Sequence, residues 1–413
     1  MPLQGPLIVV SEKPAEYLIA ALGKAGAFPV VETRWVNAQA AVASIEPAAV
    51  IIDDCDGIEP VAAAAFERKI EQTKLFVPVI VRATALPVPF TRALPVAADA
   101  PIERLFARLG SALRVRELHG TVLRRIEAQS RSGHVPQLPD GDPLDEASVL
   151  ALGRGRSFPT LSVAVGERVG VVGALSVEAA GRYLAARQID GIVIGDGFSP
   201  RVIDAFLLVL SEDARFRDLP VAALGAGTGS AQLPNFLRED DPLRLVARVL
   251  PLVRVHAFDA RLKRMLKSLE CEGLLDPETG LLSTKAFGED LAHAVDQAGE
   301  RGNALSIARF SFETPLDRRI SMDAARVVSR LVRQIDFACR LEDGSILTVF
   351  TGTDLRAAHV VARRLASALR RGMLRAESQE APSGPNVTLA TLKPDDTVIT
   401  LMSRVAPRMV AAT

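Results

Sequence analysis

The sequence predicts an α/β protein with two doubly wound parallel-sheet domains followed by a third α/β domain. Three observations support this fold class. Short apolar runs alternate with amphipathic helical stretches through two successive parts of the chain, a pattern typical of parallel sheets. A long helical stretch follows over residues 242–272. A hairpin is then expected, because Asp343-Gly344 lies between two apolar runs.

The domain boundaries are placed where the composition changes. Residues 1–129 form the first domain and residues 159–245 the second, joined by a linker over 130–158 in which Ser, Gly, Pro and Asp follow one another closely. Residues 246–272 form a connecting helix, and residues 273–413 form the third domain. The apolar stripe of the long helix predicts either the seam of a homodimer or an ordinary core stripe, with comparable weight.

The composition excludes several classes of function. Basic and acidic residues balance at 49 each, so no overall charge attracts nucleic acid or an anionic membrane. Cys55, Cys271 and Cys339 are far apart in the sequence and the five histidines are scattered, which predicts neither a disulfide framework nor a metal site. Neither a signal peptide nor an apolar run of membrane-spanning length is found, so we expect a cytoplasmic protein.

The first domain should contain five strands. Asp53 follows the third strand, at the carboxyl edge where open α/β sheets bind their ligands. Helices are expected at residues 15–24, 38–45 and 101–129, and strands at 7–11, 29–33, 49–52, 76–81 and 94–97. The second domain repeats the pattern. Its helices are expected at residues 177–187 and 202–210, and its strands at 161–165, 171–175, 191–194, 220–224 and 235–237.

The third domain carries the most informative stretch. A helix over residues 324–332 ends at Arg333, and Asp336 then leads into the hairpin strands 337–341 and 346–350. A cation and a carboxylate three residues apart can both face one polar ligand. Further strands are expected at 305–312 and 387–392, and helices at 355–370 and 395–412.

These residues resemble those of GGDEF domains, which make cyclic di-GMP from two GTP molecules. Arg333-x-x-Asp336 is followed by five spacer residues and a five-residue turn, and residues 276–282 resemble the D-x-x-T-G-L that opens these domains. The resemblance implies that Arg333 and Asp336 form the inhibitory site of the family, which binds cyclic di-GMP. It also implies that Arg364 supplies the second arginine of that site, and that Arg340 contributes as well.

The catalytic signature itself does not match. Residues 342–346 read E-D-G-S-I, so Gly344 and Ser345 replace the carboxylates that hold Mg²⁺ in the family. Arg309 falls on the metal-binding aspartate of the first strand. Because Mg²⁺ takes hard oxygen ligands, the resemblance implies a domain that binds cyclic di-GMP without catalytic residues or a cofactor. The protein is therefore expected not to be an enzyme.

The first two domains resemble the receiver domains of response regulators. Asp53 falls on the phospho-acceptor position, but residues 11–12, Ser-Glu, replace the acidic pair, and Ala100 replaces the lysine of Lys-Pro. In the second domain Gly195 replaces the phospho-acceptor, with Asp196 beside it. Two roles of Asp53 therefore stay open: it is a phospho-acceptor, or it is only a polar residue at the end of a strand.

The order receiver, receiver, degenerate GGDEF resembles signalling proteins of the PleD/PopA type. This resemblance implies a cyclic di-GMP receptor, located at the cell pole, that recruits adaptor or regulatory proteins for cell-cycle proteolysis by ClpXP. The alternative is an enzyme, a weakly active diguanylate cyclase controlled by phosphorylation of Asp53. A scaffold without any ligand is a third hypothesis.

Overall fold

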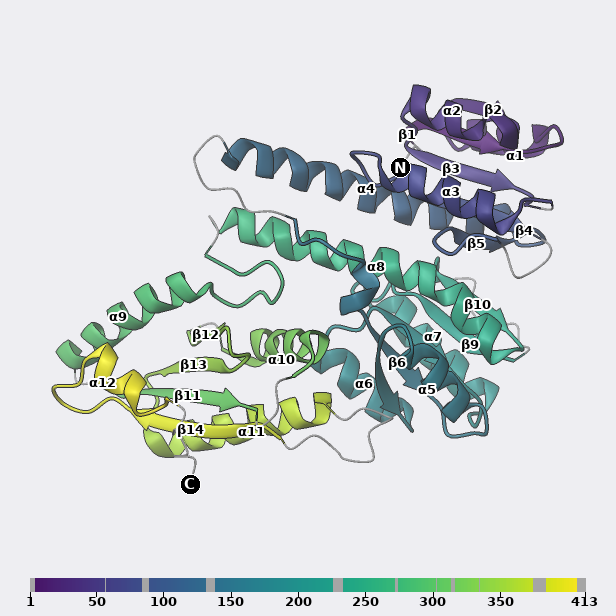
Figure 1. The fold of residues 1–413 in the computed structure, drawn as a ribbon. Helices are drawn as coiled ribbons and strands as arrows, with labels where there is room; N and C mark the ends of the chain where they lie inside the picture. Colours follow the sequence, from purple (N-terminus) through teal and green to yellow (C-terminus); the bar gives the residue numbers. More distant parts are fainter. Residues whose placement is uncertain are drawn as a thin grey trace.

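The computed structural model describes ten stretches of the chain: residues 4–55, 57–83, 89–130, 138–225, 233–271, 274–301, 303–312, 316–333, 335–373 and 384–406. These residues form two five-stranded sheets and one four-stranded sheet. Figure 1 shows the two five-stranded domains on either side of a pair of long helices, and the third domain beside the second. None of the described helices has the length and apolar character that crossing a membrane requires.

The first domain has the predicted parallel sheet, in the flavodoxin-like strand order β2-β1-β3-β4-β5. One helix, α3, was not predicted, because its Ala-rich sequence carries no strong apolar period. The elements are β1 Gln4–Val10, α1 Glu16–Lys24, β2 Phe28–Thr33, α2 Trp35–Ile45, β3 Ala49–Asp53, α3 Pro60–Glu71, β4 Val79–Ala83, β5 Leu94–Ala97 and α4 Ile102–Ser130.

The second domain has the same topology, with the strand order β10-β9-β8-β6-β7 and all pairs parallel. It begins with the short 3-10 helix η1 inside the predicted linker. The elements are η1 Pro143–Glu146, β6 Ser148–Leu152, α5 Phe158–Gly166, β7 Gly170–Ala174, α6 Val177–Ala186, β8 Gly191–Ile194, α7 Pro200–Glu212, β9 Val221–Leu224, β10 Phe236–Glu239 and α8 Pro242–Glu270.

Two predictions for this domain are wrong. Residues 161–165 belong to helix α5, in which Leu161 and Val165 are both buried, four residues apart on one helical face. The first strand is β6, within the predicted linker, and it is buried along its whole length. A short apolar run does not distinguish a helix from a strand by period alone, which explains the exchange.

The third domain contains an antiparallel sheet in the order β12-β13-β11-β14. Helices α10 and α11 pack on one face of the sheet, and α9 and α12 pack on the other. The elements are α9 Thr284–Arg301, β11 Leu305–Ser311, α10 Arg318–Leu331, β12 Phe337–Arg340, β13 Ile346–Thr351, α11 Leu355–Met373, β14 Asn386–Thr391 and α12 Val398–Ser403.

The predicted hairpin is confirmed. Strands β12 and β13 pair from Phe337 opposite Val349 to Arg340 opposite Ile346. Gly344 has a φ of 79°, a conformation that glycine adopts at little cost in the turn. Part of the predicted last helix, residues 407–412, lies outside the described residues.

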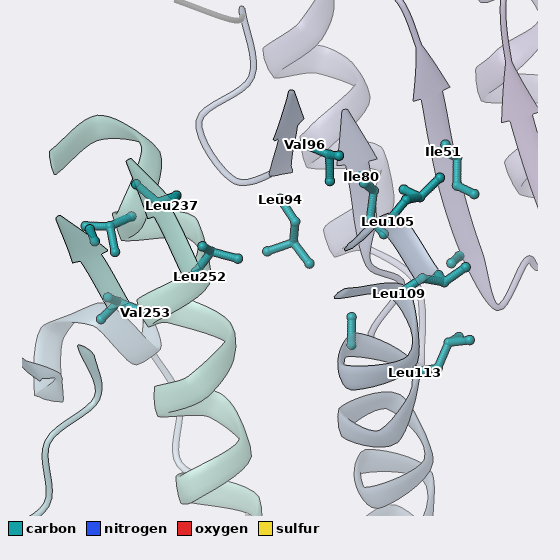
Figure 2. Packing of buried hydrophobic residues seen from close by; sticks show 14 of the residues in the cluster. Ile51, Ile80, Leu94, Val96, Leu105, Leu109, Leu113, Leu237, Leu252 and Val253 are labelled. Carbon is teal, nitrogen blue, oxygen red and sulfur yellow. The ribbon is translucent and has the colours of Figure 1, made fainter. Parts of the chain in front are cut away.

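Helices α4 and α8 lie side by side, as Figure 1 shows. The apolar stripe of α8 packs within the chain, because Leu245, Val249 and Leu262 are each fully buried. Figure 2 shows the core that the first domain shares with α8 and β10, in which Leu94 lies between Leu105 and Leu252. The stripe is therefore a core stripe in this chain, the second of the two alternatives, and it does not provide a dimer seam.

Candidate functional site

The turn of the β12–β13 hairpin lies against strand β11. Arg309 on β11 is 8% exposed, and its Nη2 donates to Oδ2 of Asp343 in the turn. The other oxygen of Asp343 accepts from the backbone N–H of Ser345 at 3.0 Å and from its hydroxyl at 2.6 Å. Burial raises the pKa of Asp343, but the Ser345 hydrogen bonds and the Arg309 charge outweigh it and hold the pKa below its ordinary value.

This arrangement does not suit a divalent cation. The guanidinium of Arg309 already neutralises the carboxylate of Asp343, and Gly344 and Ser345 offer no second carboxylate. Among the residues that the structure describes, no group of three or more His, Cys, Asp or Glu side chains could hold a metal ion. A site for Mg²⁺ needs several oxygen ligands, so the residues present do not fit this ion.

Arg333 and Asp336 lie together in the loop between α10 and β12. The backbone N–H of Asp336 donates to the carbonyl of Arg333 at 3.0 Å, which closes a tight turn. Asp336 is 9% exposed, and its Oδ1 accepts from the backbone N–H of Thr351 at 3.0 Å. Burial raises the pKa of Asp336, although the Thr351 hydrogen bonds and the Arg333 charge lower it in part.

The arginines of the predicted site differ in their surroundings. Arg333 and Arg364 are both exposed, and neither forms an ion pair with another described residue. Arg364 lies on α11, whose neighbouring Leu365 is buried against the sheet and α10. Arg340 lies at the opposite end of β12 from Asp336, and its Nε donates to the hydroxyl of Ser321 on α10 at 3.0 Å. The structure therefore separates Arg340 from the loop that holds Arg333 and Asp336.

A cavity of about 260 Å³ lies between the second and third domains. Helix α6 contributes Arg182, Tyr183 and Arg187 to its wall, whereas the third domain contributes Val327 from α10 and Ala368 from α11. Sequence reasoning missed this cavity, because its two walls come from elements about 140 residues apart in the chain.

Arg182 and Arg187 line this cavity, and further arginines lie near it in the sequence of α10 and α11. Arg364 lies one helical turn before Ala368 on α11, and Arg330 lies nearly one turn after Val327 on α10. Arg187 forms an ion pair with Asp323 that joins α6 to α10. The cavity therefore lies within one helical turn of one arginine of the predicted site.

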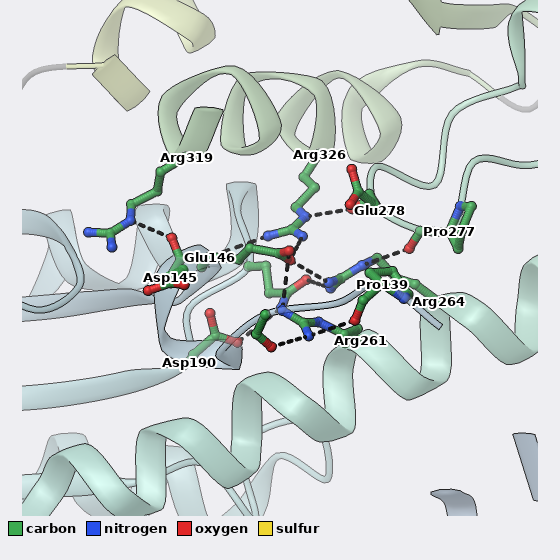
Figure 3. A network of polar contacts seen from close by, with 12 residues as sticks. Pro139, Asp145, Glu146, Asp190, Arg261, Arg264, Pro277, Glu278, Arg319 and Arg326 are labelled. Atoms are coloured by element: carbon green, nitrogen blue, oxygen red, sulfur yellow. Dashed lines mark hydrogen bonds and ion pairs between the residues drawn. The ribbon is translucent and has the colours of Figure 1, made fainter. Parts of the chain in front are cut away.

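A second polar cluster fixes α10 against the second domain. Figure 3 shows Glu146 of η1 between arginines from two helices. Arg326 of α10 donates to it at 2.7 Å, Arg261 of α8 donates at 3.2 Å, and Arg264 of α8 lies 3.6 Å away. Burial raises the pKa of Glu146, but the three arginines outweigh it and hold the pKa below its ordinary value. Because α10 ends two residues before Arg333, this cluster positions the predicted ligand site.

The carboxyl edge of the first domain carries an internal ion pair. Asp53 meets Nη1 of Arg82 at 2.8 Å, and Arg82 also donates to the carbonyl of Ala98 at 3.0 Å. Glu12 accepts from the backbone N–H of Trp35 at 3.1 Å, at the start of α2. Thr84, the threonine expected after the fourth strand, lies outside the described residues. The carboxylate of Asp53 is therefore neutralised by the neighbouring strand.

The same edge of the second domain is closed by its own loop. A side chain at Gly195 would meet Leu161 at 3.0 Å, so the position has little room for an aspartate. Asp196 accepts from the backbone N–H groups of Arg156 and Ser157 at 3.0 and 3.1 Å. Asp196 therefore shapes the loop after β6.

Comparisons with known proteins give fold likeness only. No family model matches the chain, and no curated protein matches it. Similar solved structures include the coiled coil and GGDEF domain of DgcB from Caulobacter crescentus in complex with c-di-GMP, at 20% identity over 35% of this chain and 83% of that chain, with a TM-score of 0.30. The FimX GGDEF domain from Pseudomonas aeruginosa is 18% identical over 32% of this chain and 88% of that chain, with a TM-score of 0.28.

Proposed function

We propose that this chain is a non-catalytic receptor for cyclic di-GMP in signalling. Its third domain is then a GGDEF domain that retains the inhibitory-type site of Arg333, Asp336 and Arg364 and lacks the active site. The observation that carries the proposal is the ion pair between Arg309 and Asp343. This pair fills the position at which the resemblance expects a metal ion, while Arg333 and Arg364 stay exposed.

Loss of catalysis follows from the charges. Joining two nucleotides through phosphates needs metal ions that neutralise the charge developing on the phosphoryl oxygens. Arg309 repels a cation at this position, and Gly344 and Ser345 cannot attract one. The turn has two carboxylates, those of Glu342 and Asp343, and the carboxylate of Asp343 already binds Arg309. A diguanylate cyclase controlled by Asp53 is disfavoured for the same reason, and also because Arg82 neutralises Asp53.

Binding of a cyclic dinucleotide is supported by the side chains of Arg333, Asp336 and Arg364. The guanidinium fork of an arginine matches phosphate oxygens and guanine edges, and its flat face stacks on bases. Arg333 and Arg364 are exposed and can act in this way, since neither is held in a salt bridge within the described part of the chain. Asp336 uses Oδ1 for Thr351, and its second carboxylate oxygen is available to accept from a guanine N–H.

The cavity beside α6 suggests how the ligand would act on the whole chain. An intercalated pair of cyclic di-GMP molecules on Arg364 would extend toward Arg182 of the second domain, which lines the cavity with Ala368 of α11. The ligand would then favour the arrangement in which the two domains touch, by its higher affinity for that state.

The output of the receptor rests on the resemblance alone. We propose that the bound, cytoplasmic chain recruits adaptor or regulatory proteins at the cell pole, linked to cell-cycle proteolysis by ClpXP, and that it acts as a homodimer. Co-purification of such proteins with the tagged chain, with and without cyclic di-GMP, tests this step. Capture that does not change with the ligand would contradict it.

Calorimetric titration of cyclic di-GMP into the purified chain tests the binding site. We expect saturable binding that Arg333→Ala and Arg364→Ala each weaken by about tenfold or more, the loss of one charge-assisted contact. Arg363→Ala is the matched control, because Arg363 is equally exposed and adjacent on the same helix. Equal affinity in all three variants would overturn the site.

A further inference from the structure

Helices α4 and α8 are a sequence repeat. Residues 104–115, RLFARLGSALRV, align with residues 244–255, RLVARVLPLVRV, at a constant spacing of 140. Six of the twelve positions are identical: Arg104 and Arg244, Leu105 and Leu245, Ala107 and Ala247, Arg108 and Arg248, Arg114 and Arg254, Val115 and Val255. The rings of His119 and Phe258 have centroids 5.2 Å apart, and further along Val122 and Leu262 pack in one cluster, so the helices run in parallel in this register.

Each helix contacts the other domain, as in a dimer with two-fold symmetry. Arg108 of α4 reaches the carbonyl of Phe236 in the second domain, and Val255 of α8 packs in the same core as Leu94 of the first. The sheets correspond as well. In the first domain the carbonyl of Pro78 accepts a hydrogen bond from the backbone N–H of Val50. In the second domain the carbonyl of Pro220 accepts the equivalent bond from the backbone N–H of Ile192. Residues 76 and 218, each two places before the proline, therefore occupy equivalent positions.

On one side of this pseudo-symmetric pair the arginine has an acidic partner. Arg114 of α4 donates to both oxygens of Asp218, at 2.8 and 3.0 Å. The hydroxyl of Ser111 also donates to Asp218 at 3.2 Å. The cavity beside them has a volume of about 200 Å³.

On the other side the residue equivalent to Asp218 is not acidic. Phe76 stands where Asp218 stands, so Arg254, the equivalent of Arg114, has no carboxylate at that position. Arg254 turns instead to Asp142, which accepts from its Nε and Nη2 at 2.9 Å each. Its Nη1 is buried without a hydrogen-bond partner among the described residues. A cavity of about 350 Å³, larger than its counterpart, lies here and is lined by Arg254 and Phe76.

The walls of this larger cavity are mostly apolar. Phe258, Ile70, Leu75 and Leu94 line it, and a volume near 350 Å³ lies in the range of small-molecule sites. His119 also lines it. Its Nδ1 accepts from the backbone N–H of Phe76 at 3.0 Å, so the neutral ring carries its proton on Nε2. Burial and the Arg116 charge lower the pKa of His119, which favours that neutral ring.

The acidic groups at the cavity each have their own donors. Glu67 accepts from the backbone N–H groups of Thr91, Arg92 and Ala93. Glu71 forms an ion pair with Arg92 at the mouth. The buried Nη1 of Arg254 therefore remains the donor without an acceptor.

We infer that the cavity between Arg254 and Phe76 binds a small apolar molecule that carries a carboxylate. The carboxylate accepts from Nη1 of Arg254, the equivalent of the arginine that pairs with Asp218 on the other side. The apolar body lies against Phe258 and Leu94. The site couples such a molecule to the contact between the first domain and α8, and it does not depend on the proposed binding of cyclic di-GMP.

Decanoate is the probe, and decanol, which has the same chain without the carboxylate, is the matched ligand. We expect decanoate to raise the unfolding temperature of the purified chain as its concentration rises, and decanol to have a much smaller effect. Equal effects of the two, or no effect of decanoate up to its solubility, would overturn the inference.

Two variants locate the site. Arg254→Gln should weaken decanoate binding by about tenfold or more, whereas Arg114→Gln, at the equivalent position with an internal acid, should not change it. Phe76→Asp supplies a carboxylate of the chain itself at the position equivalent to Asp218, so it should also abolish decanoate binding. This second variant tests the site if circular dichroism shows that Arg254→Gln is unfolded. Decanoate binding of wild-type strength in folded Arg254→Gln or Phe76→Asp would contradict the site.

Discussion

Arg326 in α10 donates to Glu146 of the second domain at 2.7 Å, while its Nε donates to the carbonyl of Glu278 at 2.9 Å. One buried arginine thus joins the second domain, the segment that follows α8, and the helix that leads to Arg333. The side chains of Arg326 and Glu146 are 7% and 10% exposed, so their ion pair is largely shielded from water. This pair is one of several contacts that join α10 to the second domain, together with the ion pair between Arg187 and Asp323.

Removing the charge of Glu146 should loosen that arrangement. Glu146→Gln leaves three arginines around a neutral group, and breaking a buried ion pair of this kind costs roughly 3 kcal/mol. The first urea-induced transition of the purified chain measures the effect. Glu278→Gln is the control, since its partner Arg318 is 65% exposed and the loss should be below about 1 kcal/mol. Equal losses in both variants would contradict the role of Glu146.

The contribution of Glu146 should also depend on pH. Its pKa is depressed in the folded chain, because the three arginines outweigh the effect of burial. Such a group stabilises fully above its unfolded pKa of about 4.3, and the contribution disappears as pH falls through the lower folded value. The stability difference between wild type and Glu146→Gln should stay constant from about pH 7 to 5 and shrink below about pH 4. A difference that grows on acidification would have the wrong sign.

Asp336→Asn should separate folding from binding. The amide oxygen can still accept from the N–H of Thr351, and burial raises the pKa of Asp336, so its charge does not stabilise the fold. We expect an unchanged or slightly higher unfolding temperature, together with cyclic di-GMP binding weakened about tenfold. Calorimetry and thermal unfolding of one preparation measure both. A strongly destabilised variant would mean that the carboxylate is structural.

Asp53 should resist phosphorylation. Its carboxylate is neutralised by Arg82 at 2.8 Å, and Glu12 is engaged at the start of α2. Incubation with acetyl phosphate and Mg²⁺, followed by a phosphate-affinity gel, should give no shifted band in wild type or Asp53→Asn. A band in wild type that Asp53→Asn removes would establish a working phospho-acceptor instead.

Much of the fold could be predicted from local patterns. The buried strands β1, β3 and β8 are short apolar runs, and Asp343-Gly344 predicted the hairpin. Helix α5 was mistaken for a strand because five apolar or small residues fit either period. Strand β6 was assigned to a linker because Gly, Pro and Asp surround it.

The site could be predicted less completely, since its decisive contacts join distant residues. The family resemblance implied that Arg309 replaces a metal ligand, but its pairing with Asp343 depends on the sheet register between β11 and β13. The pairing of Glu146 with Arg326 spans 180 residues, and no local pattern indicates it. Likewise, the pairing of Asp53 with Arg82 required the alignment of β3 with β4.

The most direct test of the central claim uses one preparation of the purified chain for two measurements, cyclic di-GMP binding by calorimetry and cyclic di-GMP production from GTP with Mg²⁺. A receptor without an active site should bind the dinucleotide saturably and form no product above the level of a chain-free control. Product formation, or the absence of binding, would contradict it.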